Sequence, residues 1–90
     1  MAKFSIYVSS KFKNQFKKLS KFDRDLSNKV IFKLSNGETL DTKYKDHQLK
    51  GKFKEFRECH IKPNLLLIYK IIDDELVLYL FQIGSHSDLF

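Results

Sequence analysis

Residues 65–72 read LLLIYKII and form the longest apolar run of the chain. A turn signal containing Pro63 and Asn64 precedes the run, and a second turn signal, Asp-Asp-Glu at 73–75, follows it. Eight residues are too few to cross a membrane, but they are typical of a strand that is covered on both faces. We therefore predict that residues 65–72 form the central strand of a sheet.

The segments on either side of this run also read as strands. Residues 53–61 are amphipathic, and residues 75–83 are rich in apolar side chains. Because both are joined to the central strand by short turns, we predict an antiparallel meander. Residues 4–8 alternate between apolar and other side chains, which indicates a short first strand. The sheet should thus have about four strands.

Two apolar stripes with helical spacing lie between the first strand and the meander. Ser9 or Ser10 can cap the first helix, and Asp23 offers an N-cap for the second. Asn36 and Gly37 form a helix stop. The stripes comprise Phe12, Phe16 and Leu19, and then Leu26, Val30, Ile31 and Leu34. The lysine-rich faces of both helices should point outwards.

These elements predict one α+β domain over residues 1–90, with a helical hairpin packed on one face of a mainly antiparallel sheet. Residues 38–52 read as a charged loop. The second face of the sheet should be open, and a functional site could lie there.

The charge is basic and unevenly distributed. Residues 1–62 hold 16 basic and 7 acidic side chains, a net charge of +9. Residues 63–90 hold 1 basic and 4 acidic side chains, a net charge of −3, and the two values sum to the net charge of +6. Such a field attracts nucleic acid, an anionic membrane or an acidic protein, and it does not choose among them. A single cysteine excludes an internal disulfide, and the N-terminal segment has no apolar leader, so we expect a cytoplasmic protein.

Three histidines are the main candidates for chemistry: His47, His60 and His86. Imidazole titrates near neutral pH, so it can take a proton from a ribose 2′-hydroxyl or protonate a leaving 5′-oxygen. The spacings of 13 and 26 residues match no compact zinc motif, and we expect neither a metal nor a cofactor. A structural role on the surface is the alternative for each histidine.

Two further residues of the predicted strand 53–61, Arg57 and Cys59, could also be considered for chemistry. Arg57 could clamp a phosphate, although an ion pair with Glu55, Glu58 or an acid of a turn is the more ordinary role for it. Cys59 should be a small buried residue, because adjacent strand residues point to opposite faces and the thiol cannot face His60.

The run YKDHQLKGKFKEFRECHIKPNLLLIYK at 44–70, followed by GSHSDLF at 84–90, closely resembles the YafQ branch of the RelE/ParE superfamily of bacterial toxins. The resemblance implies a RelE-like fold and a ribosome-dependent endoribonuclease that cuts mRNA in the ribosomal A site without a metal. It also implies a cognate antitoxin that blocks the toxin and carries it to operator DNA, and it implies no membrane.

The resemblance assigns functions to particular positions. His47, His60 and His86 become proton-transfer and phosphate-contacting groups, with His60 and His86 as the acid–base pair and His47 assisting. Phe90 becomes the aromatic side chain that contacts the substrate, and Asn64 occupies a catalytic position. We further expect Arg57, Lys50, Lys52, Lys54 and Gln82 to contact the RNA.

Two positions depart from the family pattern. Members usually have Asp, often followed by Trp, where this chain has Asn64 and Leu65, and they usually have Arg where it has Gln82. An amide cannot carry charge, so we hypothesise a weakened or re-tuned member. Three alternatives remain: a RelE-like module that acts mainly through its antitoxin and operator complex, a gyrase poison of the same superfamily, and a small non-catalytic RNA-binding domain.

Overall fold

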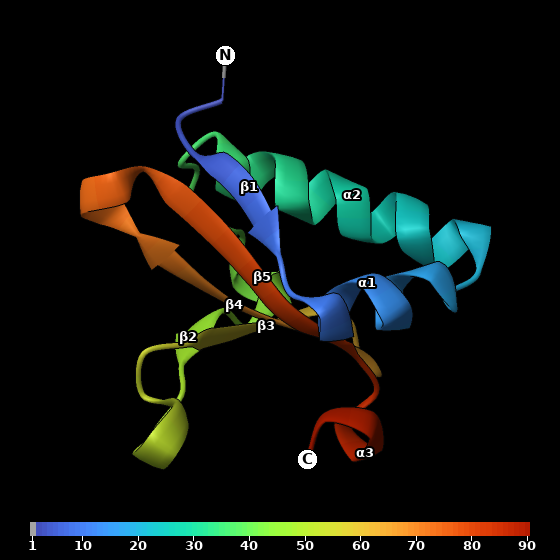
Figure 1. Cartoon of the computed structure of the whole chain (residues 1–90). Helices are drawn as coiled ribbons and strands as arrows, with labels where there is room; N and C mark the ends of the chain where they lie inside the picture. The colour runs from blue at the N-terminus through green and yellow to red at the C-terminus, as the bar shows by residue number, and fades with distance from the viewer. Residues whose placement is uncertain (1) are drawn as a thin grey trace.

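The computed structural model describes residues 2–90 and contains a five-stranded sheet with two helices packed against one face (Figure 1). The strands are β1 (Ser5–Val8), β2 (His47–Gln48), β3 (Arg57–Lys62), β4 (Leu65–Ile72) and β5 (Val77–Gly84). Their order in the sheet is β1-β5-β4-β3-β2, with β1 parallel to β5 and the other neighbours antiparallel. The central position of β4 confirms the prediction from its apolar run.

The helices are α1 (Ser10–Lys17), α2 (Lys21–Ser35) and the short C-terminal α3 (His86–Leu89). Three single 3-10 turns complete the description: η1 (Thr42–Tyr44), η2 (Gly51–Phe53) and η3 (Asp73–Glu75). Among residues 2–90, no helix has both the length and the apolar character required to span a membrane. The predicted α+β class and helical hairpin are confirmed.

Serine side chains begin both helices of the hairpin. The Ser9 hydroxyl accepts a hydrogen bond from the Phe12 amide at 2.9 Å, and the Ser20 hydroxyl accepts one from the Asp23 amide at 3.1 Å. The prediction of Asp23 as the second N-cap was wrong, because the helix begins at Lys21 and Asp23 lies in its first turn. The predicted stop is confirmed, since α2 ends at Ser35 and Gly37 has a positive φ of 78°.

The hydrophobic core lies between the helical hairpin and the facing side of the sheet. Along β4, alternate residues point into this core, as the period of two in a strand requires. The buried core residues are Phe4, Phe12, Val30, Ile31, Leu34, Leu40, Cys59, Ile61, Leu65, Leu67, Tyr69, Leu78, Leu80 and Ile83.

Three predicted strand boundaries were wrong. The expected loop 38–52 contains a fifth strand, because His47 and Gln48 pair with Glu58 and Arg57. Strand β3 begins at Arg57 rather than at residue 53, since the chain turns through η2 and the Phe56 amide donates to the Phe53 carbonyl at 2.9 Å. Strand β5 begins at Val77, after the η3 turn.

The second face of the sheet is less open than predicted. The segment with η2 and the C-terminal α3 both lie on this side, opposite the hairpin (Figure 1). Leu66 and Ile68 of β4, which alternate with the core residues, are each only 1% exposed. This face therefore has a buried apolar floor, and any site on it is bordered by η2 and α3.

Candidate active site

Two of the three histidines meet at a buried carboxylate on the second face of the sheet. His47 lies opposite Glu58 in the β2–β3 pairing, and His60 follows Glu58 by two residues on the same side of β3. The Nε2 atoms of His47 and His60 each lie 3.6 Å from the same Glu58 oxygen, Oε1. The Glu58 side chain is only 7% exposed. A proton taken up by either imidazole would therefore have a carboxylate partner shielded from water.

Sequence reasoning missed Glu58 as a member of this site and considered it only as a partner for Arg57. A signal was available: residues two apart in a strand share a face, so His60 implies Glu58 beside it. The contact with His47 required the β2–β3 pairing, which the charged segment 38–52 did not reveal.

The backbone determines which nitrogen of His47 carries a proton. His47 Nδ1 lies 2.8 Å from the carbonyl oxygen of Lys45. Because a carbonyl can only accept, Nδ1 must be the donor, and in the neutral ring Nε2 is left with a free lone pair. The nitrogen that faces Glu58 is thus the one able to accept a proton from substrate.

The third histidine lies on the C-terminal turn, which folds back over the end of β5. Ser85 and Asp88 form a capping box, and their hydrogen bonds lower the pKa of the Asp88 carboxyl. Gly84 permits this close return, because a β-carbon there would lie 3.2 Å from the Asp88 Cβ atom. The turn brings the rings of His86 and Phe90 to a centroid distance of 5.2 Å.

The Phe90 side chain packs against a neighbouring ring and is also accessible to solvent. Its ring meets that of Phe53 edge to face at 6.5 Å, which connects α3 to η2. More than half of the residue, 55%, remains exposed. Part of this terminal side chain can therefore contact a substrate without unfolding the tail.

Arg57 is engaged elsewhere. Its guanidinium contacts both oxygens of Asp46, with Nε to Oδ1 at 3.3 Å and Nη2 to Oδ2 at 3.2 Å. The hydroxyl of core residue Tyr69 donates to the same Asp46 carboxylate at 2.6 Å. This pairing raises the pKa of Arg57, and burial raises that of Tyr69. Alternation along β3 directs Arg57 away from Glu58 and His60, so the structure does not bring it to the histidines.

Gln82 and Asn64 occupy different environments. Gln82 is 7% exposed, and its side-chain oxygen accepts a hydrogen bond from the Gln15 amide at 3.3 Å. Asn64 is exposed in the turn between β3 and β4, close in sequence to His60. Gln82 is thus held inside the fold, whereas Asn64 is accessible.

The three predicted lysines surround η2. Lys50, Lys52 and Lys54 are all exposed, and the Lys52 ammonium lies 5.3 Å from the Phe53 ring centroid. They carry positive charge along the border of the second face. Their position is suitable for contacts with an RNA backbone.

Cys59 is buried in the core, as predicted, with 0% of its surface exposed. Burial raises the pKa of its thiol to about 12, so it remains protonated at neutral pH. A thiolate nucleophile at this position is excluded on these grounds.

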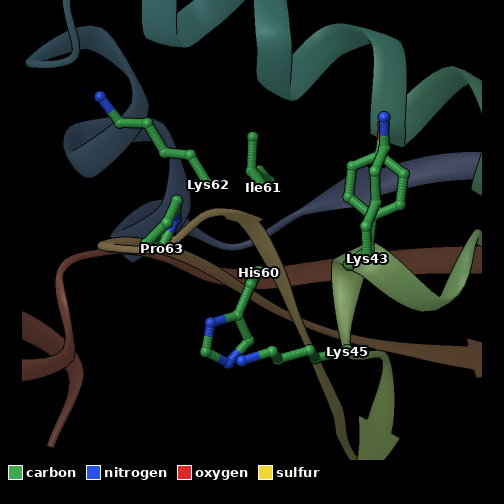
Figure 2. A pocket seen from close by; sticks show the side chains of 7 residues that line it. Lys43, Lys45, His60, Ile61, Lys62 and Pro63 are labelled. Atoms are coloured by element: carbon green, nitrogen blue, oxygen red, sulfur yellow. The ribbon is translucent and has the colours of Figure 1, made fainter.

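A cavity of about 370 Å³ adjoins His60 on the side of η1 and the β3–β4 turn. Figure 2 shows that side chains from both segments border it. The lining residues are Lys43, Tyr44, Lys45, His60, Ile61, Lys62 and Pro63. Within residues 2–90, no carboxylate lines this cavity, so an anion could enter it without facing a like charge from them.

Histidine and glutamate side chains are common ligands of metal ions. Across residues 2–90, no group of three or more histidine, cysteine, aspartate or glutamate side chains is arranged to hold a metal ion.

The family model for the bacterial toxin of the type II toxin–antitoxin system, YafQ, matches residues 4–90. The mRNA interferase toxin YafQ of Escherichia coli strain B / BL21-DE3 is 33% identical over 89 residues, covering 94% of each chain. The protein of the same name from strain K12 is 39% identical over 57 residues, which span 63% of this chain and 60% of that protein.

Solved structures agree with this match. A metal-bound toxin from Helicobacter pylori is 48% identical with a TM-score of 0.88, and the alignment covers 97% of this chain and 99% of that chain. The E. coli DinJ–YafQ toxin–antitoxin complex contains a chain that is 30% identical, with a TM-score of 0.85 and 98% coverage of both. The match of the family model over nearly the whole chain, together with these relatives, establishes that the chain belongs to the YafQ family of type II toxin–antitoxin toxins.

Proposed function

We propose that this protein is a ribosome-dependent mRNA endoribonuclease that cleaves translated mRNA by metal-independent acid–base chemistry. The observation that carries the proposal is the pair His47 and His60 around the buried Glu58 carboxylate. The curated relatives bear the name mRNA interferase toxin, which supports the same activity for this chain.

The proposed reaction needs one base, one acid and a nearby positive charge. A base removes the proton from the ribose 2′-hydroxyl, and the 2′-oxygen attacks the adjacent phosphorus. The bond from phosphorus to the 5′-oxygen breaks, and an acid protonates that oxygen. The products are a 2′,3′-cyclic phosphate, which water can open to a 3′-phosphate, and a 5′-hydroxyl. Each proton transfer has a candidate imidazole in the site.

We assign His60 and His86 as the acid–base pair, with His47 assisting. Glu58 is a positioning residue, because its carboxylate is 3.6 Å from His60 Nε2 and can balance the charge of a protonated ring. The defined tautomer of His47 leaves its Nε2 atom ready to accept a proton. Phe90, adjacent to His86, would hold a base of the substrate by stacking.

The proposed partners follow from charge and from the relatives. Residues 1–62 carry a balance of +9, which suits ribosomal RNA and an acidic antitoxin. A crystal structure shows E. coli YafQ in a toxin–antitoxin complex with DinJ, and we propose a cognate antitoxin of that kind for this chain. Contact with operator DNA would be made through the antitoxin complex. The site of action is the cytoplasm, where mRNA is translated.

A second candidate function is an attenuated toxin that acts mainly as an antitoxin-binding and co-repressor module. The burial of Gln82 and its hydrogen bond to Gln15 favour this alternative, because the family usually has an arginine at that position. A buried amide supplies no charge to a phosphate.

Induced expression tests the proposal in cells. A nuclease stops growth with loss of intact mRNA, and co-expression of the neighbouring antitoxin gene restores growth. Growth arrest with broken DNA and intact mRNA would instead indicate a gyrase poison. Tight antitoxin binding without any toxicity would favour the co-repressor module.

A further inference from the structure

Two of the cations near His60 already have carboxylate partners, and the Lys43 ammonium lies 5.2 Å from the Tyr44 ring centroid. Arg57 is bound to Asp46, and the Lys62 ammonium lies 2.8 Å from an Asp23 oxygen. Gln82 has no charge. Yet the attack of a 2′-oxygen on phosphorus places extra negative charge on the non-bridging oxygens, and a fixed cation normally stabilises it. The proposed reaction therefore requires a positive group that is still free.

Lys45 meets this requirement. It is exposed, and within residues 2–90 it takes part in none of the ion pairs. It lines the cavity of about 370 Å³ beside His60. Figure 2 shows its side chain extended toward the His60 ring, whereas Lys62 points away from that ring.

The backbone of Lys45 also connects the two histidines. Its φ of 49° is in the left-handed region, which residues with a β-carbon adopt rarely. Leu76 has a similar φ of 53° after the turn η3, so this conformation alone indicates only the end of a 3-10 turn. What distinguishes Lys45 is that its carbonyl accepts the Nδ1 hydrogen of His47 while its side chain reaches toward His60.

We propose that Lys45 is a further catalytic residue, whose ammonium contacts a non-bridging oxygen of the scissile phosphate next to His60. The inference rests on the proposed function. No covalent step involves the lysine: it remains protonated and donates hydrogen bonds to the phosphate as negative charge builds up. The cavity lined by Lys43, Tyr44 and Lys45 then holds the RNA backbone beside the cleaved bond.

Three substitutions separate the role of the ammonium from that of the backbone. Lys45→Ala removes the charge and keeps the strained backbone, Lys45→Gly removes the charge and relieves the strain, and Lys45→Arg keeps the charge. The assay is single-turnover cleavage of ribosome-bound mRNA at saturating enzyme. Lys29→Ala, on the exposed surface of α2 across the sheet, is the matched control.

The expected result is a loss of about 10²–10³-fold in the cleavage rate for both the alanine and the glycine variant. The arginine variant should retain most of the rate, and Lys29→Ala should match the wild type. Thermal melts of each variant accompany the assay. If Lys45→Ala fails to fold, Lys45→Gly still removes the ammonium without straining the backbone and decides the question.

Three results would overturn the inference. Wild-type rates in Lys45→Gly would restrict the residue to a backbone role. Normal cleavage by all three variants, combined with weaker binding of the antitoxin, would assign the cavity to the antitoxin. If the wild-type protein cuts no ribosome-bound mRNA, both the proposed function and this inference fail. If the wild type cuts mRNA and the Lys45 variants cut it equally fast, only this inference fails and the proposed function stands.

Discussion

Replacing Glu58 with glutamine probes the electrostatics of the site while preserving its shape. Glutamine has nearly the same size as glutamate, so the packing beneath His47 and His60 should survive. The substitution removes a charge that lies 3.6 Å from the Nε2 atoms of both histidines. At an effective dielectric constant of about 20, two unit charges about 4 Å apart attract by about 4 kcal/mol.

Most of that attraction is offset by the cost of holding the carboxylate away from water. The 3.6 Å contact is an ion-pair contact and not a hydrogen bond. Exposed ion pairs contribute about 0.2–1 kcal/mol and breaking a buried one costs about 3–5 kcal/mol, so a carboxylate that is 7% exposed beside a ring that is 25% exposed should contribute about 2 kcal/mol. Taking about 2 kcal/mol as the loss for a protonated imidazole, the step that charges it should slow by about thirtyfold. Because Glu58→Gln adds no bulk, the melting temperature should change by less than about 5 °C.

The assay is single-turnover cleavage of ribosome-bound mRNA. Glu55→Gln is the matched control, because it makes the same chemical change at an exposed position on the approach to β3. The control should cleave at the wild-type rate. A Glu58→Gln protein that folds normally and cleaves as fast as the control would refute the reasoning, since it would mean that neither histidine depends on this carboxylate.

Four further substitutions test other parts of the account. Phe90→Ala should lower cleavage by about 5- to 160-fold, because base–aromatic stacking contributes about 1–3 kcal/mol, and the melting temperature should fall only slightly. An unchanged cleavage rate with a lowered melting temperature would make Phe90 a packing residue alone. Cys59→Ala should leave cleavage unchanged and destabilise the fold by about 1 kcal/mol in a denaturant titration, and any loss of activity in the folded variant would contradict the buried, protonated thiol. Asn64→Asp and Gln82→Arg should each raise cleavage in a translation extract, the second with a lower melting temperature because position 82 is buried; if neither the single nor the double change does so, these positions do not limit the rate.

The fold was largely predictable because its strongest signals are local. The apolar run of β4 and the stripes of the hairpin identify elements that bury one or both faces. The strand β2 was missed because its two residues, His47 and Gln48, are polar and exposed, and their pairing with β3 leaves no periodic pattern. Its existence depends on contacts between residues about ten positions apart, which no local rule captures.

The sequence names candidate residues for the site but does not give their environment. The motifs name the three histidines and Phe90. Arg57 does form an ion pair, but with Asp46, whereas the sequence suggests Glu55, Glu58 or an acid of a turn. The carboxylate of Glu58 and the ammonium of Lys45 were not identified, because their proximity to the histidines arises from β2–β3 pairing and from a left-handed residue. The spacing of Glu58 and His60 along a strand does indicate that these two side chains share a face. The contact of Glu58 with His47 and the position of Lys45 cannot be read from the spacing of residues along the chain.

Gln82 is a further residue whose environment cannot be read from the sequence. The sequence indicates an uncharged residue where the family usually has a cation, but only the structure reveals the hydrogen bond to Gln15. Restoring the charge at position 82 would therefore have to displace a packed amide, which is why a stability cost is expected.

Primer extension on ribosome-bound mRNA, with wild type and His86→Ala compared in parallel, tests the central claim most directly. The account predicts that the wild type cuts within the A-site codon, leaves a 5′-hydroxyl, and remains active when divalent ions other than those required by the ribosome are chelated. His86→Ala should cut about 10²–10⁴-fold more slowly, because it lacks one partner in proton transfer. Equal cleavage by the folded His86→Ala protein, or cleavage of free mRNA as fast as ribosome-bound mRNA, would contradict it.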